Sequence, residues 1–164
     1  MRLTKRITLI LAVLALLSAF GCAPKRTGAT YDPFVAFPAT AQWAWDEGLN
    51  RLPTDPSMAE LNIRAIVRDT ITQGLAKRGY SMAPERAQAD FLAHYQVGIG
   101  KRIDRSSVEG FGSLSLTLVD PATSRNVWVG FVKTESDVSL SEADRRKRLQ
   151  RNIDKMLGKF PPSQ

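Results

Sequence analysis

The chain has 164 residues, with 23 Lys and Arg against 16 Asp and Glu, and 43% of its residues are hydrophobic. These proportions are close to those of an average globular domain, so wholesale disorder and a fibrous repeat are excluded. One Cys excludes a disulfide within the chain, and one His without Cys partners leaves too few ligands for a structural zinc site. We expect a single folded domain without a metal or other cofactor.

The first 21 residues differ from the rest of the chain. They contain three basic residues and no acid, and an apolar run covers residues 7–17. This order is typical of a secretory signal peptide. The alternative, a transmembrane helix, would need about 20 apolar residues, and the run is shorter than that. We therefore predict that the chain is exported.

The signal ends at the only Cys of the chain. Ser18-Ala19-Phe20-Gly21-Cys22 resembles the bacterial lipobox, in which the peptide before the Cys is cut and the thiol is lipidated. The resemblance implies cleavage between Gly21 and Cys22 and lipidation of Cys22, whereas the alternative is an inert, buried Cys. Because Ala23 and not Asp follows, it also implies sorting to the outer membrane, facing the periplasm. Residues 22–30 have no periodicity and should form a flexible tether.

Residues 31–164 are predicted to form one α+β domain that begins with a short strand at residues 42–45. A helix should follow, with Thr54 as its N-cap, Pro56 at its first position and a stop at Gly79. Apolar residues recur at helical spacing on one face of this segment. They are Ile63, Ile66, Val67, Ile71 and Leu75.

Three strands are predicted next, because the period changes to two from Asp90 onward. Phe91, Ala93, Tyr95, Val97 and Ile99 should form the inward face of the first of them. Two glycines, Gly98 and Gly100, should mark a bend or a bulge. Residues 111–119 and 127–132 alternate in the same way around turn residues at 120–125, which predicts an antiparallel hairpin.

A second helix is predicted near the end of the chain. Ser139 and Glu142 have the spacing of a capping box, and an apolar stripe follows. The stripe consists of Leu149, Ile153, Met156, Leu157 and Phe160. The order of elements predicts a two-layer α+β sandwich, with a mixed or antiparallel sheet of about four strands and both helices on one face.

Five motifs occur in register along nearly the whole mature chain. They are Tyr31-Asp32-Pro33-Phe34 with Trp43-Ala44-Trp45, Lys77-Arg78-Gly79-Tyr80, Ala89-Asp90-Phe91-Leu92-Ala93-His94-Tyr95-Gln96-Val97-Gly98, Leu118-Val119-Asp120-Pro121-Ala122-Thr123 with Val127-Trp128-Val129-Gly130, and Lys159-Phe160-Pro161-Pro162. In this order the chain resembles the bacterial lipoproteins of the domain-of-unknown-function family 4136. The resemblance implies export, lipidation and an α+β domain, and it implies no known reaction, substrate or catalytic residue.

No catalytic constellation is visible in the sequence. A Ser-His-Asp triad would need His94 as its base, and the Gly-x-Ser-x-Gly elbow is absent, so we interpret His94 as a polar strand residue. A group of aromatic residues could line a ligand groove, but we favour the alternative that they fill the core. This group is Tyr31, Phe34, Phe37, Trp43 and Trp45, and Trp128 is interpreted in the same way.

The excess positive charge of the mature chain lies in its last 23 residues, which hold seven basic and three acidic side chains. Lys147, Arg151 and Lys155 recur every four residues opposite the apolar stripe, with Arg148 and Lys159 beside them. We call these five residues the basic strip. It is either a solvated face that suits the dipole of the helix C-terminus or a binding site for phospholipid or lipopolysaccharide phosphates.

These observations favour a non-enzymatic lipoprotein that is anchored through Cys22 and binds an envelope component or a partner protein. An envelope hydrolase that uses carboxylates or His94 is one alternative, and a structural envelope-assembly factor is another. Nucleic acid is not an expected partner of an exported chain, despite the pI of about 9.9.

Overall fold

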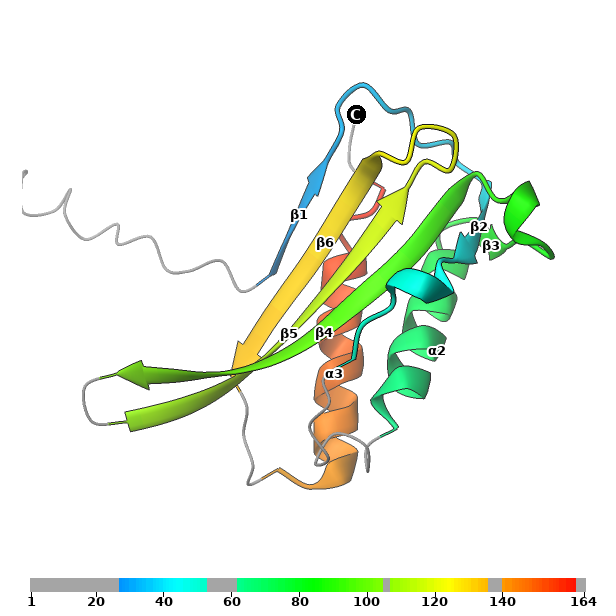
Figure 1. Cartoon of the computed structure of the whole chain (residues 1–164). Helices are drawn as coiled ribbons and strands as arrows, with labels where there is room; N and C mark the ends of the chain where they lie inside the picture. The colour runs from blue at the N-terminus through cyan, green and yellow to red at the C-terminus, as the bar shows by residue number, and fades with distance from the viewer. Residues whose placement is uncertain (1–26, 53–61, 105–106, 136–139, 162–164) are drawn as a thin grey trace, which may run out of the picture.

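The computed structural model describes residues 27–52, 62–104, 107–135 and 140–161, which form one sheet and two helices (Figure 1). The strands are β1 (Thr27–Tyr31), β2 (Ala41–Trp45), β3 (Tyr80–Met82), β4 (Phe91–Asp104), β5 (Ser107–Val119) and β6 (Asn126–Glu135). The helices are α2 (Ile63–Ala76) and α3 (Glu142–Leu157), with short 3-10 turns at Glu47–Leu49 and Arg86–Gln88. None of the helices in these ranges is long and apolar enough to cross a membrane.

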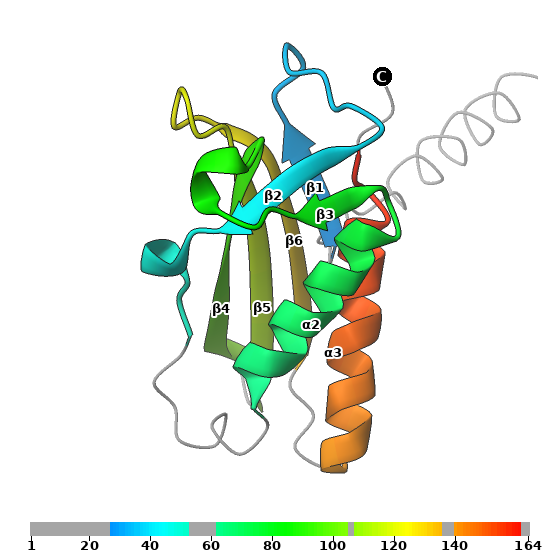
Figure 2. The same cartoon turned by 90° about the vertical axis from the view of Figure 1, so that its right-hand side faces the viewer.

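The six strands form a mixed sheet in the order β1-β6-β5-β4-β2-β3. Strands β1, β6, β5 and β4 pair with one another in antiparallel fashion, whereas β2 runs parallel to both β4 and β3. Both helices cover the same face of this sheet (Figure 2). The α+β class and the two helices on one face agree with the prediction, but the sheet has six strands where about four were predicted.

The two additional strands lie at the opposite edges of the sheet. Strand β1 falls partly in residues 22–30, which were predicted to be a tether, so the domain begins by Thr27 and not at residue 31. Its five residues carry no alternating pattern, and they are extended because they pair with β6. Strand β3 has only three residues and pairs with β2 alone. Such short edge strands depend on a partner more than on their own composition.

Helix α2 begins later than predicted. Asn62 has a left-handed backbone conformation, with φ of 43° and ψ of 47°, so the helix begins at Ile63. The predicted start at Thr54 and Pro56 lies outside the described residues. The predicted stop is confirmed, because the helix ends at Ala76 and Gly79 has a φ of 86°. The predicted apolar face of α2 is buried along its whole length.

The long β4–β5 pair keeps one pairing register where a bend or a bulge was predicted. Residues from Leu92 to Asp104 pair in one register, so the bulge expected at Gly98 and Gly100 is absent from this pairing. A register shift occurs instead in the β5–β6 pair, between Leu118 and Val119. The glycine at position 100 has a packing role, because a Cβ there would overlap the ring of Phe111 on the neighbouring strand.

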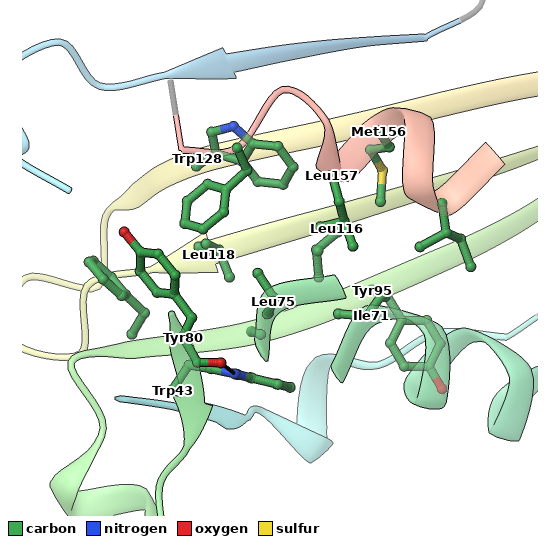
Figure 3. Close-up of a cluster of buried hydrophobic side chains, with 14 of the residues drawn as sticks. Trp43, Ile71, Leu75, Tyr80, Tyr95, Leu116, Leu118, Trp128, Met156 and Leu157 are labelled. Atoms are coloured by element: carbon green, nitrogen blue, oxygen red, sulfur yellow. Dashed lines mark hydrogen bonds between the residues drawn. The ribbon is translucent and has the colours of Figure 1, made fainter. Parts of the chain in front are cut away.

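The core lies between the sheet and the helices and is rich in aromatic residues (Figure 3). Trp43 and Trp128 are almost completely buried, as predicted, and Phe37 packs against Phe91 and Phe160. Two aromatic residues that were expected in the core are not there: Tyr31 is 48% exposed and Phe34 is 93% exposed. They lie at the end of β1 and in the turn that follows it.

Candidate functional site

The basic strip lies on α3, a helix that is amphipathic and capped. The hydroxyl of Ser141 accepts a hydrogen bond from the backbone N–H of Asp144 at 3.2 Å and donates one to its carboxylate at 2.6 Å. Ser141 is therefore the N-cap of α3 and pairs with Asp144. The predicted pair of Ser139 and Glu142 was wrong, and residue 139 lies outside the described ranges. Ile153, Met156 and Leu157 are fully buried and attach the helix to the sheet.

The cations of the basic strip face away from this buried side. Lys147, Arg151, Lys155 and Lys159 are exposed, and Arg148 is half-buried. At a rise of about 1.5 Å per residue, the first three form a row that is about 12 Å long. The structure therefore presents the predicted strip as a line of charge on the surface of α3.

The packing of α3 shows on which side of the helix each cation of the strip lies. Met156 lies against Gly130 of β6, and Leu157 lies against Gly74 of α2. Successive helix residues are about 100° apart, so Lys155 lies on the side of Met156 that is turned away from α2. Arg148, seven residues earlier, lies on that same side. The strand there is β1, which packs against α3 at the edge of the sheet. Arg151 and Lys147 lie about 140° and about 180° around the helix from Met156, so they point to solvent and away from the sheet.

The strip keeps its positive charge unneutralised. Among the ion pairs of the described ranges, the one on α3 joins Arg146 to Glu142 at 3.4 Å. None of the ion pairs in these ranges includes a cation of the basic strip. Its side chains are therefore free to contact an external anion.

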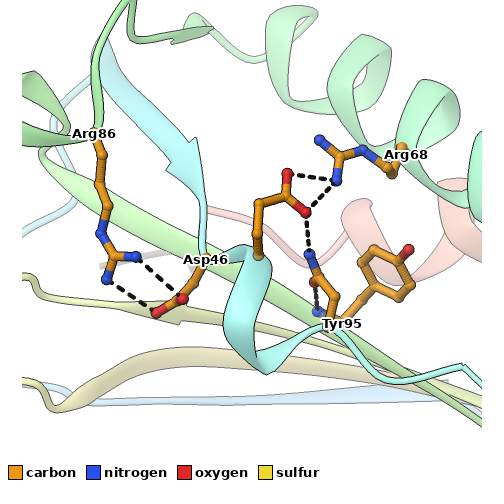
Figure 4. Close-up of polar contacts among 6 residues, drawn as sticks. Asp46, Arg68, Arg86 and Tyr95 are labelled. Atoms are coloured by element: carbon orange, nitrogen blue, oxygen red, sulfur yellow. Dashed lines mark hydrogen bonds and ion pairs between the residues drawn. The ribbon is translucent and has the colours of Figure 1, made fainter.

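His94, the alternative catalytic residue, lies on the sheet face that the helices leave uncovered. Burial lowers its pKa, and the nearby Asp46 carboxylate partly opposes this effect. Asp46 is held by Arg86 through two contacts of 3.2 Å (Figure 4). Nδ1 of His94 is buried without a hydrogen-bond partner. Among these described residues, His94 is therefore not oriented by a hydrogen bond to an acid, as the His of a catalytic triad is.

A second polar cluster connects the segment after β2 to α2 and β4. Arg68 contacts both carboxylate oxygens of Glu47, at 2.7 and 2.8 Å, and its guanidinium lies 4.7 Å from the centre of the Trp45 ring. The side-chain amide of Asn50 donates a hydrogen bond to the carboxylate of Glu47, and its oxygen accepts one from the backbone N–H of Tyr95 (Figure 4). Because each of these polar groups is used within the cluster, we assign it a structural role.

The described ranges contain no group of three or more His, Cys, Asp or Glu side chains that could hold a metal ion. The predicted cleavage site at Gly21 and the predicted lipidation site at Cys22 lie outside these ranges. The sequence analysis missed one surface feature, the exposed turn formed by residues 31–34. Asp32 followed by Pro33 is a turn signal that could have indicated it.

Residues 28–162 match the model of a family described as "Domain of unknown function (DUF4136)". No curated protein matches the chain. Among solved structures, the chain is similar to a DUF4136 family protein from Bacteroides thetaiotaomicron, with a TM-score of 0.54 and 11% identity, covering 82% of this chain and 95% of that one.

Two further solved structures are similar. One is a PDZ domain protein from Parabacteroides distasonis, with a TM-score of 0.56 and 13% identity, covering 85% of this chain and 36% of that one. The other is a PelC dodecamer from Paraburkholderia phytofirmans, with a TM-score of 0.50 and 14% identity, covering 84% of this chain and 98% of that one. At these identities the likeness concerns the fold alone.

Proposed function

Because the chain belongs to the DUF4136 family, whose function is unknown, we propose a function from its own residues: it is a non-enzymatic lipoprotein that binds an anionic envelope component through the basic strip. Its lipid is attached at Cys22, and Ala23 directs it to the outer membrane, where the domain faces the periplasm. The anion is a phosphate group of a phospholipid or of lipopolysaccharide.

The observation that carries this proposal is the row of unpaired cations on the solvent-facing side of α3. Each Lys or Arg near an anionic surface contributes about 1 kcal/mol of binding free energy, and this contribution decreases as salt is added. Two cations of the strip, Arg148 and Lys155, lie on the side of α3 next to β1, the strand that follows the anchor in sequence, so an anchored domain would carry them toward the headgroups.

Anchoring is tested on the native protein. We expect mass spectrometry of the mature N-terminus to find acylated Cys22 and the protein to fractionate with the outer membrane. Replacement of Cys22 by Ser should release it from that fraction. A mature product that retains Met1, or an unmodified thiol in a protein that is not bound to membranes, would disprove the proposed anchoring.

The strip is tested with the chain that begins at Ala23, which retains every described strand and helix. We expect the triple variant Lys147→Glu, Arg151→Glu, Lys155→Glu to lose binding to vesicles that contain an anionic phospholipid, as measured by co-sedimentation at low salt. The matched control reverses three exposed cations outside the strip, Arg51, Arg64 and Lys77, with the same change in net charge. Equal weakening in both triple variants would show that net charge and not the strip determines binding.

A further inference from the structure

The turn after β1 carries the most exposed large apolar side chain of the described residues. Phe34 is 93% exposed, and Tyr31, three residues earlier, is 48% exposed. The other aromatic residues near this part of the chain are in the core, including Phe37, which stacks on Phe91. Exposure of two aromatic side chains within four residues is therefore a local property of this turn.

The turn is held in one conformation by Asp32. Its carboxylate accepts the backbone N–H of Phe34 at 3.0 Å and pairs with Arg125 at 3.0 Å. Its backbone N–H donates to the carbonyl of Val127 at 3.0 Å, and its carbonyl accepts the N–H of Val35. A rigid turn loses little conformational entropy on binding, so Phe34 is preorganised for contact with a partner.

The position of the turn points to one partner. Thr27 is the fifth residue after Cys22, so their Cα atoms are at most about 18 Å apart. From Thr27, β1 runs for about 13 Å along the edge of the sheet and ends at Tyr31. Tyr31 is thus at most about 31 Å from Cys22, so the turn can reach the bilayer that would hold the anchor when the β1 edge lies along it.

We propose that the turn of residues 31–34 is a membrane contact, in which Phe34 and Tyr31 insert at the lipid–water interface of the leaflet that holds the anchor. This inference rests on the proposed function, because it requires lipidation of Cys22. Tyr favours this interface because its ring is amphipathic, and transfer of the Phe ring from water is favourable in proportion to the apolar area removed. The domain then lies with its β1 edge on the membrane and with Arg148 and Lys155, on the adjoining side of α3, toward the headgroups.

The test introduces a fluorescent reporter at the turn. The three native Trp residues, Trp43, Trp45 and Trp128, are at most 7% exposed, so they contribute a constant background. The native, membrane-purified protein with Phe34→Trp is reconstituted into vesicles of phosphatidylcholine that is brominated on its acyl chains. The control is Met82→Trp. Met82 is a large apolar residue that is 48% exposed, as Tyr31 is, and it lies on β3, at the opposite edge of the sheet.

We expect the bromolipid to quench the added emission of Phe34→Trp, and we expect that emission to be shifted to the blue. The emission of Met82→Trp should be neither quenched nor shifted. Both variants change exposed positions, and unchanged thermal unfolding will confirm that they fold.

Each contrary result has a distinct meaning. If the protein carries its lipid by mass spectrometry and the two variants are quenched equally, the membrane contact is overturned and the anchor remains. If Cys22 is unmodified in the same preparation, both proposals are overturned. A blue shift of Phe34→Trp that grows with protein concentration in the soluble chain from Ala23 would assign the turn to a contact with a second copy instead.

Discussion

At the scale of single residues, the core contains two tyrosines of almost equal burial and different bonding. Tyr80 is 1% exposed, and its hydroxyl donates to the carbonyl of Pro38. Tyr95 is 0% exposed, and its hydroxyl is buried without a partner. Burial raises the pKa of both side chains. A hydroxyl that is buried without a hydrogen bond reduces stability, whereas a bonded one contributes to it.

The two tyrosines should therefore respond differently to removal of the hydroxyl. We expect Tyr80→Phe to lower the free energy of unfolding by about 1 kcal/mol, because a hydrogen bond is lost. Tyr95→Phe should leave the free energy of unfolding unchanged or raise it. Urea titrations of both variants measure this difference. A larger loss for Tyr95→Phe than for Tyr80→Phe would show that the Tyr95 hydroxyl has a partner.

His94 should make the stability of the domain sensitive to mild acid. Burial lowers its pKa in the folded chain, so below its ordinary pKa of about 6.5 the unfolded chain binds the proton more tightly. The contribution of neutral His94 is therefore complete above that pH and is lost as the pH falls below it. We expect the urea midpoint of the wild type to decrease in this range and that of His94→Gln to decrease less. Parallel curves for the two proteins would refute this role of His94.

At the scale of elements, the helices and the central hairpin follow from local patterns, and the details of their contacts depend on glycines. Gly130 of β6 lies under both Trp128 and Met156, so a Cβ at this position would overlap their side chains. Gly112 of β5 has room, because a Cβ there would meet only Thr134, at 3.7 Å. Two glycines of the same sheet thus have different reasons to be present.

Substitution by Ala should separate these two reasons. We expect Gly130→Ala to destabilise the domain by about 1 to 3 kcal/mol, because it overpacks the contact between β6 and α3. Gly112→Ala should have no effect or should stabilise the domain by up to about 1 kcal/mol, because the unfolded chain loses conformational freedom. Thermal unfolding of the two variants distinguishes them, and equal destabilisation would contradict the assigned contact at Gly130.

The elements also show where sequence reasoning succeeded. The hairpin of β5 and β6 and the buried faces of α2 and α3 were predicted, because the spacing of apolar residues reflects backbone geometry within each element. The cap of α3 was placed two residues too early, since Ser139 and Ser141 both offer a hydroxyl. The strands β1 and β3 were not predicted, because their few residues are extended only through pairing with distant parts of the chain.

At the scale of the whole molecule, the distribution of charge and the distribution of exposed aromatic residues converge on one edge. Two cations of the basic strip, Arg148 and Lys155, lie on the side of α3 that adjoins β1, and the exposed turn of residues 31–34 directly follows β1. The opposite edge is formed by β3. The two proposals therefore concern one face of the domain, and each is tested against control residues that lie elsewhere.

The sequence by itself determined the class of the domain, the amphipathic character of both helices and the residues of the basic strip, because these properties repeat along the chain at the period of each element. Only the tertiary structure decided that Thr27–Tyr31 is an edge strand, that Arg148 and Lys155 lie on the side of α3 next to it and that Phe34 lies outside the core. These properties depend on contacts between β1, β6 and α3, which are far apart in the sequence, and no local pattern encodes which surfaces meet when the layers pack.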